Sequence, residues 1–177
     1  LRKFHSKYKE RLKEINRESL SESDKLNYDV IDWECNMGLE GLQFKDYLMP
    51  VNQIFSQHLF IPQMAEGSGA QPFQTVKDYD NWLKRLGEYL EWCDTVIANM
   101  KIGIKEGYVL PRVLAEKTYP QFEEITKGSV EDHQFYTPVK NFPKDFNDKD
   151  KERLTSAYKK MIGERVIPTY KRVAEFM

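Results

Sequence analysis

Apolar side chains recur at helical spacing along most of the chain, and this pattern predicts five helices. They are expected at residues 1–17, from a cap at Ser21 or Ser23 to residue 44, and at residues 75–103, 111–126 and 148–177. No segment shows the alternation of apolar and polar residues that is typical of a half-buried strand. We therefore expect an all-α protein, built as an irregular bundle of about five helices with long ordered loops and forming part of a larger helical protein.

The first two predicted helices each carry one apolar stripe on a charged background, which predicts one buried face on each. In the first helix the stripe consists of Phe4, Tyr8, Leu12 and Ile15. In the second helix the predicted buried face consists of Leu26, Val30, Trp33, Met37 and Gly41. Ser21, or else Ser23, is well placed to cap the second helix.

The third predicted helix has a clear beginning and a clear end. Thr75 followed by Asp78 resembles a capping box, with Asp in place of the usual Glu. The apolar stripe that follows is wide, which predicts packing on both sides of the helix. Gly103 and Gly107 mark its exit, and Pro111 suits the first turn of the next helix.

Two proline-containing segments separate these helices. Residues 45–74 contain three prolines and two glycines, which predicts one short helix at residues 51–58 within an ordered loop that ends in a flexible tip at residues 66–70. Residues 127–147 are expected to form a loop that aromatic side chains anchor.

Two further prolines lie inside predicted helices. Pro120 is expected to bend or split the fourth helix, and Pro168 to kink the last helix near residues 164–167, since proline lacks the amide donor and clashes with the preceding turn.

Charge and composition exclude several classes of protein. The net charge of the 177 residues is −1, so no overall field attracts nucleic acid. No apolar run reaches the roughly 18 residues of a membrane span. Residues 1–25 carry a net +3, residues 26–139 a net −8 and residues 140–177 a net +4. The acidic middle faces a cationic partner, a metal or the basic ends, or else consists of solvated helix faces.

Neither the histidines nor the cysteines form a metal-binding pattern. His5, His58 and His133 are far apart, and none has a second ligand three or four residues away. Cys35 and Cys93 lie among apolar residues at helical spacing and are predicted to be buried free thiols, with one disulfide between them as the alternative in an oxidising compartment.

No recognisable catalytic pattern is present either. Ser56 and Ser129 have no visible base. The neighbouring acids Glu123–Glu124 and Glu131–Asp132 are typical of solvent-exposed helix ends, although such pairs perform acid–base chemistry when they face a cleft. We predict no catalytic residue and no metal ligand in this chain.

Four motifs in sequence resemble the N-terminal half of the bacterial domain-of-unknown-function family 885. Residues 79–114 contain the segment W-L-x-R-L and a Gly-x-x-x-Gly exit followed by Pro. Residues 21–31 resemble the family's capped helix, SESDKLNYDVI. Residues 48–64 contain Pro-x-Asn-Gln and a later Leu-x-x-Pro, and residues 164–177 contain Ile-Pro-x-Tyr.

The resemblance implies a zinc-dependent peptidase. Members of the family are similar to metallopeptidases and carry the motif H-E-x-x-P-G-H-H in their C-terminal half, where histidines bind zinc and the glutamate is the general base. Residues 1–177 would then be a single, non-catalytic helical region without cofactor, the N-terminal portion of a larger peptidase-like domain. Its partner would be the C-terminal half, which binds the zinc. The resemblance also implies a location in the cell envelope or periplasm, with a lipid anchor as one form.

Two hypotheses about function follow. In the first, the chain forms one wall of a peptide-binding cleft, with Asn52, Gln53, His58 and Arg112 as cleft residues: the amides would bind a peptide backbone, and Arg112 a carboxylate. In the second, the chain is a stand-alone helical module that binds a partner protein through residues 45–74 or through its last helix.

Overall fold

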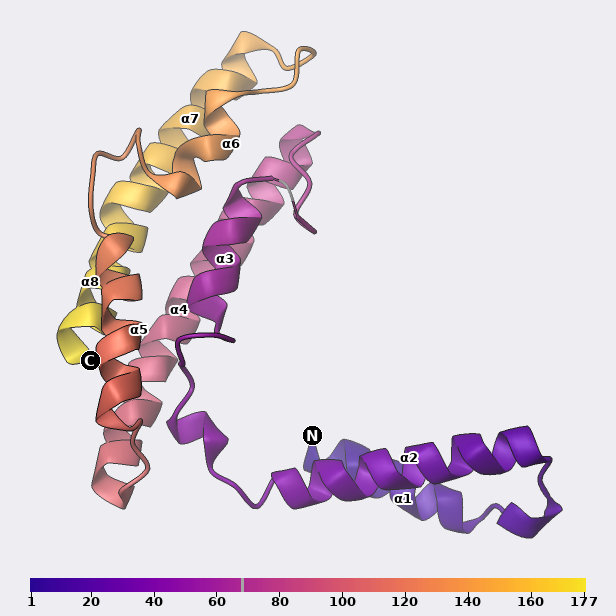
Figure 1. The fold of residues 1–177 in the computed structure, drawn as a ribbon. Coiled ribbons are helices and arrows are strands. Elements are labelled where there is room, and N and C mark those ends of the chain that lie inside the picture. The colour runs from indigo at the N-terminus through magenta and orange to yellow at the C-terminus, as the bar shows by residue number, and fades with distance from the viewer. Residues whose placement is uncertain (68) are drawn as a thin grey trace. The chain divides into compact units, whose positions relative to one another are not determined.

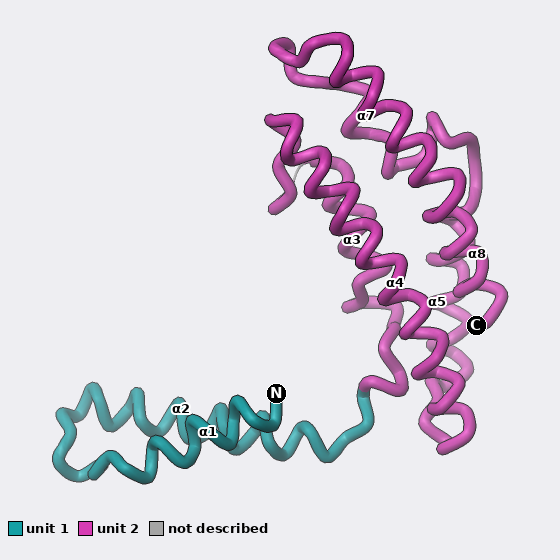
Figure 2. The backbone as a smooth tube through the Cα atoms, turned by 180° about the vertical axis from the view of Figure 1, so that it is seen from behind, with its two compact units in different colours: residues 1–46 teal, residues 47–177 magenta. Residues whose placement is uncertain are grey.

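A computed structural model describes residues 1–67 and 69–177 and confirms the all-α class (Figure 1). The described residues contain helices and connecting loops but no strand. They form two compact units, residues 1–46 and residues 47–177 (Figure 2). That residues 1–177 are a single region of a larger domain stays a prediction.

Unit 1 (residues 1–46) is a helical hairpin. Helix α1 (Arg2–Lys13) leads through the short 3₁₀ helix η1 (Arg17–Ser19) into α2 (Glu22–Gly41), against which it packs. As predicted, α2 has its N-cap at Ser21, whose hydroxyl accepts a hydrogen bond from the amide of Asp24. The guanidinium of Arg17 donates to both carboxylate oxygens of Asp29, at 2.7 and 2.6 Å, and so ties η1 to α2.

The face of α2 that the sequence predicts to be buried is exposed in the structure. The four side chains, here called the outer face of α2, are between 46% and 65% exposed: Leu26, Val30, Trp33 and Met37. The buried side chain on α2 is instead Cys35. On α1 only Leu12 of the predicted stripe is buried, while Phe4, Tyr8 and Ile15 are exposed. The periodicity indicates a face that is suited to burial, but nothing in the described structure covers it.

Unit 2 (residues 47–177) is built around one long helix, α4 (Val76–Glu106). The segments before α4 are α3 (Gln57–Ala65) and η2 (Asp46–Leu48), whose first residue belongs to unit 1. Those after it are α5 (Arg112–Glu124), η3 (Gln134–Tyr136), α6 (Thr137–Lys140), α7 (Asp148–Met161), η4 (Ile162–Val166) and α8 (Ile167–Phe176). Helix α4 packs on α7 and α8, α5 packs on α8, and α3 packs on η3.

Aromatic side chains fill the core of unit 2. Trp82, fully buried on α4, stacks on Phe135 with ring centroids 6.3 Å apart. The hydroxyl of Tyr89 donates to the hydroxyl of Tyr170 at 2.9 Å and so links α4 to α8. Cys93 is buried nearby as a free thiol, as is Cys35 in unit 1, and both agree with the prediction.

Both ends of α4 are formed by the residues that the sequence singles out. Thr75 and Asp78 make a complete capping box. At the C-terminus Gly107 adopts φ +78°, and the amide of Tyr108 donates to the carbonyl of Gly103 at 2.8 Å, as in a Schellman motif. Gly103 also allows close packing, since a Cβ at this position would lie 2.9 Å from the carbonyl oxygen of Leu48.

The last predicted helix is confirmed, and its kink is a π-helical turn. Asn147 caps α7 by accepting from the amide of Asp150 at 2.8 Å. The π-helical turn η4 (Ile162–Val166) then separates α7 from α8, which carries Pro168 in its first turn. A wider turn accommodates the missing amide donor and the bulk of the proline ring.

Several loop predictions were wrong in detail. The short helix expected at residues 51–58 lies instead at Gln57–Ala65. Residues 134–140, predicted as loop, form η3 and α6. Helix α5 continues past Pro120 without being split, and the alternative, a bend at Pro120, stays a prediction. Ser68, in the predicted flexible tip, lies outside the described residues.

Candidate functional site

The candidate residue His58 lies at the centre of a buried chain of hydrogen bonds. Its Nδ1 is 2.8 Å from the hydroxyl of Ser56, and its Nε2 is 2.9 Å from Oε1 of Gln121. The amide nitrogen of Gln121 in turn donates to the backbone carbonyl of Gln53 at 3.1 Å. The ring of His58 stacks on Phe122, with centroids 4.1 Å apart. One histidine thus fastens the start of α3 to α5.

The direction of each hydrogen bond in this chain follows from chemistry. The carbonyl of Gln53 only accepts, so Gln121 offers it the amide nitrogen and turns Oε1 toward the imidazole. Because Oε1 only accepts, Nε2 of His58 carries the proton, and Nδ1 accepts from the hydroxyl of Ser56. Burial lowers the pKa of His58, while the hydrogen bond to Gln121 opposes that shift. The neutral imidazole uses both of its nitrogens.

The Ser56–His58 contact corrects the expectation that Ser56 has no base. A serine that donates to a histidine has the arrangement of a nucleophile and its base. However, Ser56 and His58 are only 5% and 2% exposed, and neither lines a pocket among those described. The arrangement holds α3 in place.

The buried neutral histidines predict a loss of stability in acid. Burial also lowers the pKa of His133, whose Nε2 lies 2.7 Å from the carbonyl of Ile125. In the unfolded chain both imidazoles bind protons near pH 6.5. Below that pH the unfolded state takes up protons that the folded state resists, so the free energy of unfolding falls as the pH drops from about 7 toward 5.

Urea unfolding across this pH range tests the prediction. His58→Gln keeps a donor for Gln121 but cannot titrate, so we expect the variant to lose less stability between pH 7 and pH 5 than the native chain does. An unchanged pH dependence in this variant would contradict the assignment of a buried neutral His58.

Asn52 and Gln53 shape the loop before α3. Oδ1 of Asn52 accepts from the amides of Ile54 and Phe55 at 2.9 and 2.7 Å, and its Nδ2 donates to the carbonyl of Phe55 at 2.7 Å. Oε1 of Gln53 is buried without a hydrogen-bond partner among the described residues. The three hydrogen bonds fix the turn that presents Ile54 and Phe55, which are 62% and 75% exposed.

Arg112 is the candidate that the structure does not join to the others. Its side chain is 92% exposed, and its Nε donates to Glu116 at 2.7 Å, one helical turn along α5. Within residues 1–67 and 69–177, no hydrogen bond connects it to the other candidates Asn52, Gln53 and His58. Gln121, by contrast, joins His58 to Gln53 but was missed, because it lies 63 residues after His58 and no local pattern marks it.

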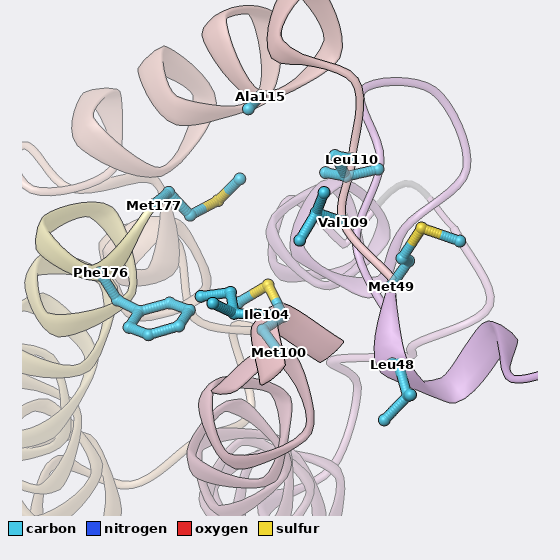
Figure 3. Close-up of a pocket in the computed structure, with 9 residues that line it drawn as sticks. All are labelled: Leu48, Met49, Met100, Ile104, Val109, Leu110, Ala115, Phe176 and Met177. Carbon is cyan, nitrogen blue, oxygen red and sulfur yellow. The ribbon is translucent and has the colours of Figure 1, made fainter. Parts of the chain in front are cut away.

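Unit 2 also contains an open apolar pocket that the sequence analysis did not identify (Figure 3). Its volume is about 200 Å³. The lining residues come from η2 and the residue after it, from the end of α4 and its exit, from α5, and from the end of α8 and the residue after it: Leu48, Met49, Met100, Ile104, Val109, Leu110, Ala115, Phe176 and Met177. Methionine side chains adapt to different apolar partners, so this pocket suits an apolar group of variable shape.

The described residues form no group of three or more His, Cys, Asp or Glu side chains that could hold a metal ion. The paired acids have ordinary surface partners: Glu123 accepts from the hydroxyl of Tyr119, Glu124 pairs with Lys127, and Glu131 pairs with Lys159. None of the described helices is both long and apolar enough to cross a membrane.

Comparison with known proteins places the chain in one family. No curated protein and no solved structure matches it. A family described as bacterial protein of unknown function, DUF885, matches it over residues 1–177, in agreement with the motifs in residues 21–31, 48–64, 79–114 and 164–177. The chain therefore belongs to the DUF885 family of bacterial proteins.

Proposed function

We propose that this chain is the non-catalytic N-terminal helical region of a zinc-dependent peptidase and that unit 2 supplies one wall of the substrate cleft. Family membership and the resemblance to metallopeptidases support the peptidase. In this proposal the C-terminal half of the parent chain contributes H-E-x-x-P-G-H-H and the zinc. The parent would be a hydrolase of the cell envelope or periplasm, with a lipid-anchored form.

The observation that supports a substrate cleft is the open apolar pocket between α4, α5 and α8. Sites for drug-sized ligands usually have volumes of roughly 300–1,000 Å³, whereas this pocket has about 200 Å³. An apolar cavity of about 150 Å³ is already large enough for benzene. The pocket therefore suits one apolar or aromatic side chain of a peptide.

The positions of the four candidate residues are compatible with this role to different degrees. Arg112 precedes the pocket residue Ala115 by three positions and so lies on the same side of α5, where it could bind a substrate carboxylate at the rim. Asn52, Gln53 and His58 hold the start of α3. Their part in the proposal is to fix unit 2, and the binding of a peptide backbone by Asn52 and Gln53 stays a prediction.

The parent protein provides the test of the peptidase. We expect the reading frame to continue beyond residue 177 into H-E-x-x-P-G-H-H, and we expect the longer protein to bind zinc and cleave peptides while residues 1–177 do neither. A reading frame that stops at Met177, or zinc-dependent cleavage by residues 1–177 alone, would rule out the proposal.

A substitution in the pocket tests the cleft separately. Ala115→Leu fills part of the pocket, so we expect a higher KM of the parent for peptides with Phe or Leu side chains and little change in kcat, as for lost ground-state binding. Val113→Leu is the control, since Val113 is exposed and does not line the pocket. Equal effects of the two substitutions, or a KM that rises equally for glycine peptides, would contradict the pocket's role.

A second candidate function is a stand-alone module that binds a partner protein through the loop before α3. The favouring observation is the exposed tip formed by Ile54, Phe55 and Phe60, with the two phenylalanine rings 6.5 Å apart. Asn52 holds this tip rigid in the free protein, which lowers the entropic cost of binding. A reading frame that ends at Met177 would favour this function over the first, and loss of partner binding in Phe55→Ser would test it.

A further inference from the structure

The outer face of α2 has the geometry of a helix-binding surface. Leu26, Val30 and Trp33 are followed by Met37 at helical spacing, so the four side chains form a continuous stripe. Trp33 and Met37 each lie two residues from the buried Cys35, which places them about 160° away from it around the helix. The stripe therefore points away from α1, and its side chains are between 46% and 65% exposed.

The charges around this stripe are mainly acidic, although Glu22 pairs with Lys25 at 2.9 Å. Helix α2 contains six acidic residues and one basic residue, a net charge of −5. Glu22 and Glu34 lie one turn from the stripe residues Leu26 and Val30, and Glu40 lies one turn from Met37. All three glutamates are exposed. Glu34 and Glu40 have no ion-pair partner in the part of the chain that the structure describes.

We propose that the outer face of α2 binds an amphipathic helix of a partner protein whose apolar side chains are flanked by lysine and arginine. An apolar stripe with acidic borders is complementary to such a helix in both shape and charge. The outer face of α2 shares no residue with the apolar pocket in unit 2. Binding at this face would be a function in addition to the proposed peptidase function.

The same charges argue against two other occupants. In a symmetric dimer this face would meet its own copy, and Glu34 and Glu40 would then approach acidic residues of the same face. Anionic lipid would likewise be repelled by the acidic borders. A basic helix is the occupant that removes the apolar stripe from water and also neutralises its borders.

Binding of two designed peptides to residues 1–177 tests the proposal. The probes are a fluorescein-labelled amphipathic 14-residue peptide of leucine and lysine and its counterpart with glutamate in place of lysine. Fluorescence anisotropy would be measured at low and high salt. We expect the lysine peptide to bind about tenfold or more tightly than the glutamate peptide, and salt to weaken its binding.

Matched variants locate the binding site. Val30→Ser and Val113→Ser make the same change at positions that are 51% and 56% exposed. We expect Val30→Ser and Trp33→Ser to weaken binding of the lysine peptide severalfold, and Val113→Ser to leave it unchanged. The double variant Glu34→Gln/Glu40→Gln should reduce both the affinity for the lysine peptide and the dependence of that affinity on salt, and Glu88→Gln is its control. This double variant also keeps the test valid if Trp33→Ser alters folding.

Four results would overturn the proposal. They are equal binding of the two peptides, equal effects of Val30→Ser and Val113→Ser, self-association of residues 1–177 that Trp33→Ser abolishes, and binding to anionic vesicles that Trp33→Ser abolishes. If the longer parent does not bind the lysine peptide while residues 1–177 do, the face is covered by the parent's own chain, and the proposal fails as well.

Discussion

Phe122→Ala is expected to lower the free energy of unfolding by about 3–5 kcal/mol, the usual cost of truncating a buried phenylalanine. Phe122 is 1% exposed. Its ring stacks on His58 and lies 5.7 Å from the ring of Tyr170 on α8. The substitution removes the apolar partner of both rings and leaves a cavity between α3, α5 and α8. Urea unfolding followed by circular dichroism measures the effect.

Phe55→Ala provides the matched control, because it makes the same change in the same unit at a side chain that is 75% exposed. We expect a change within about 0.5 kcal/mol, as for surface substitutions in general. Similar losses in the two variants would show that the packing around His58 does not determine the stability of unit 2.

Gly103→Ala is expected to cost about 1–3 kcal/mol, the usual range for forcing an extra methyl group into a packed site. A Cβ at Gly103 would lie 2.5 Å from the carbonyl oxygen of Tyr108 and 2.9 Å from that of Leu48. Both neighbours are backbone atoms, so the exit of α4 or the η2 segment must move. Leu48 also lines the apolar pocket, so the shape of the pocket should change as well.

Gly163→Ala is the control for Gly103→Ala in the same unit. A Cβ at Gly163 would be 3.5 Å from a methyl group of Val130, an ordinary contact. Alanine also has a helix propensity about 1 kcal/mol better than that of glycine. We expect this variant to match or exceed the native stability. An unchanged stability of Gly103→Ala would contradict the close approach of the Tyr108 and Leu48 carbonyls to Gly103.

The helix boundaries could be predicted because short-range chemistry determines them. Ser21, Gly107 and the pair Thr75 and Asp78 each act through atoms within a few residues, and the structure has the expected caps at all three positions. The burial of a helix face depends instead on what lies opposite it. The same periodicity is present in α2 and α4, but only α4 has its stripe covered.

Prediction from the sequence meets the same limit at the candidate site. The role of His58 depends on Gln121, and the apolar pocket brings together residues as far apart as Leu48 and Met177. Such contacts are formed by the packing of segments that are far apart in the sequence and leave no periodic signal. The sequence predicts His58 as a cleft residue, whereas the structure buries it against a partner, Gln121, that no local pattern marks.

The π-helical turn η4 makes the core of unit 2 depend on the number of residues in its last helix. Five of the buried positions there follow one another at intervals of four residues: Leu154, Tyr158, Ile162, Val166 and Tyr170. In an α-helix each such step overshoots a full turn by about 40°, and the wider π-helical turn takes up part of this drift. Removal of one residue from Ile162–Val166 would let the wider turn close into an ordinary α-helical turn, in which the ring of Pro168 would clash with the preceding turn. The length of this segment is therefore as strict a requirement for the fold as the identity of its apolar residues.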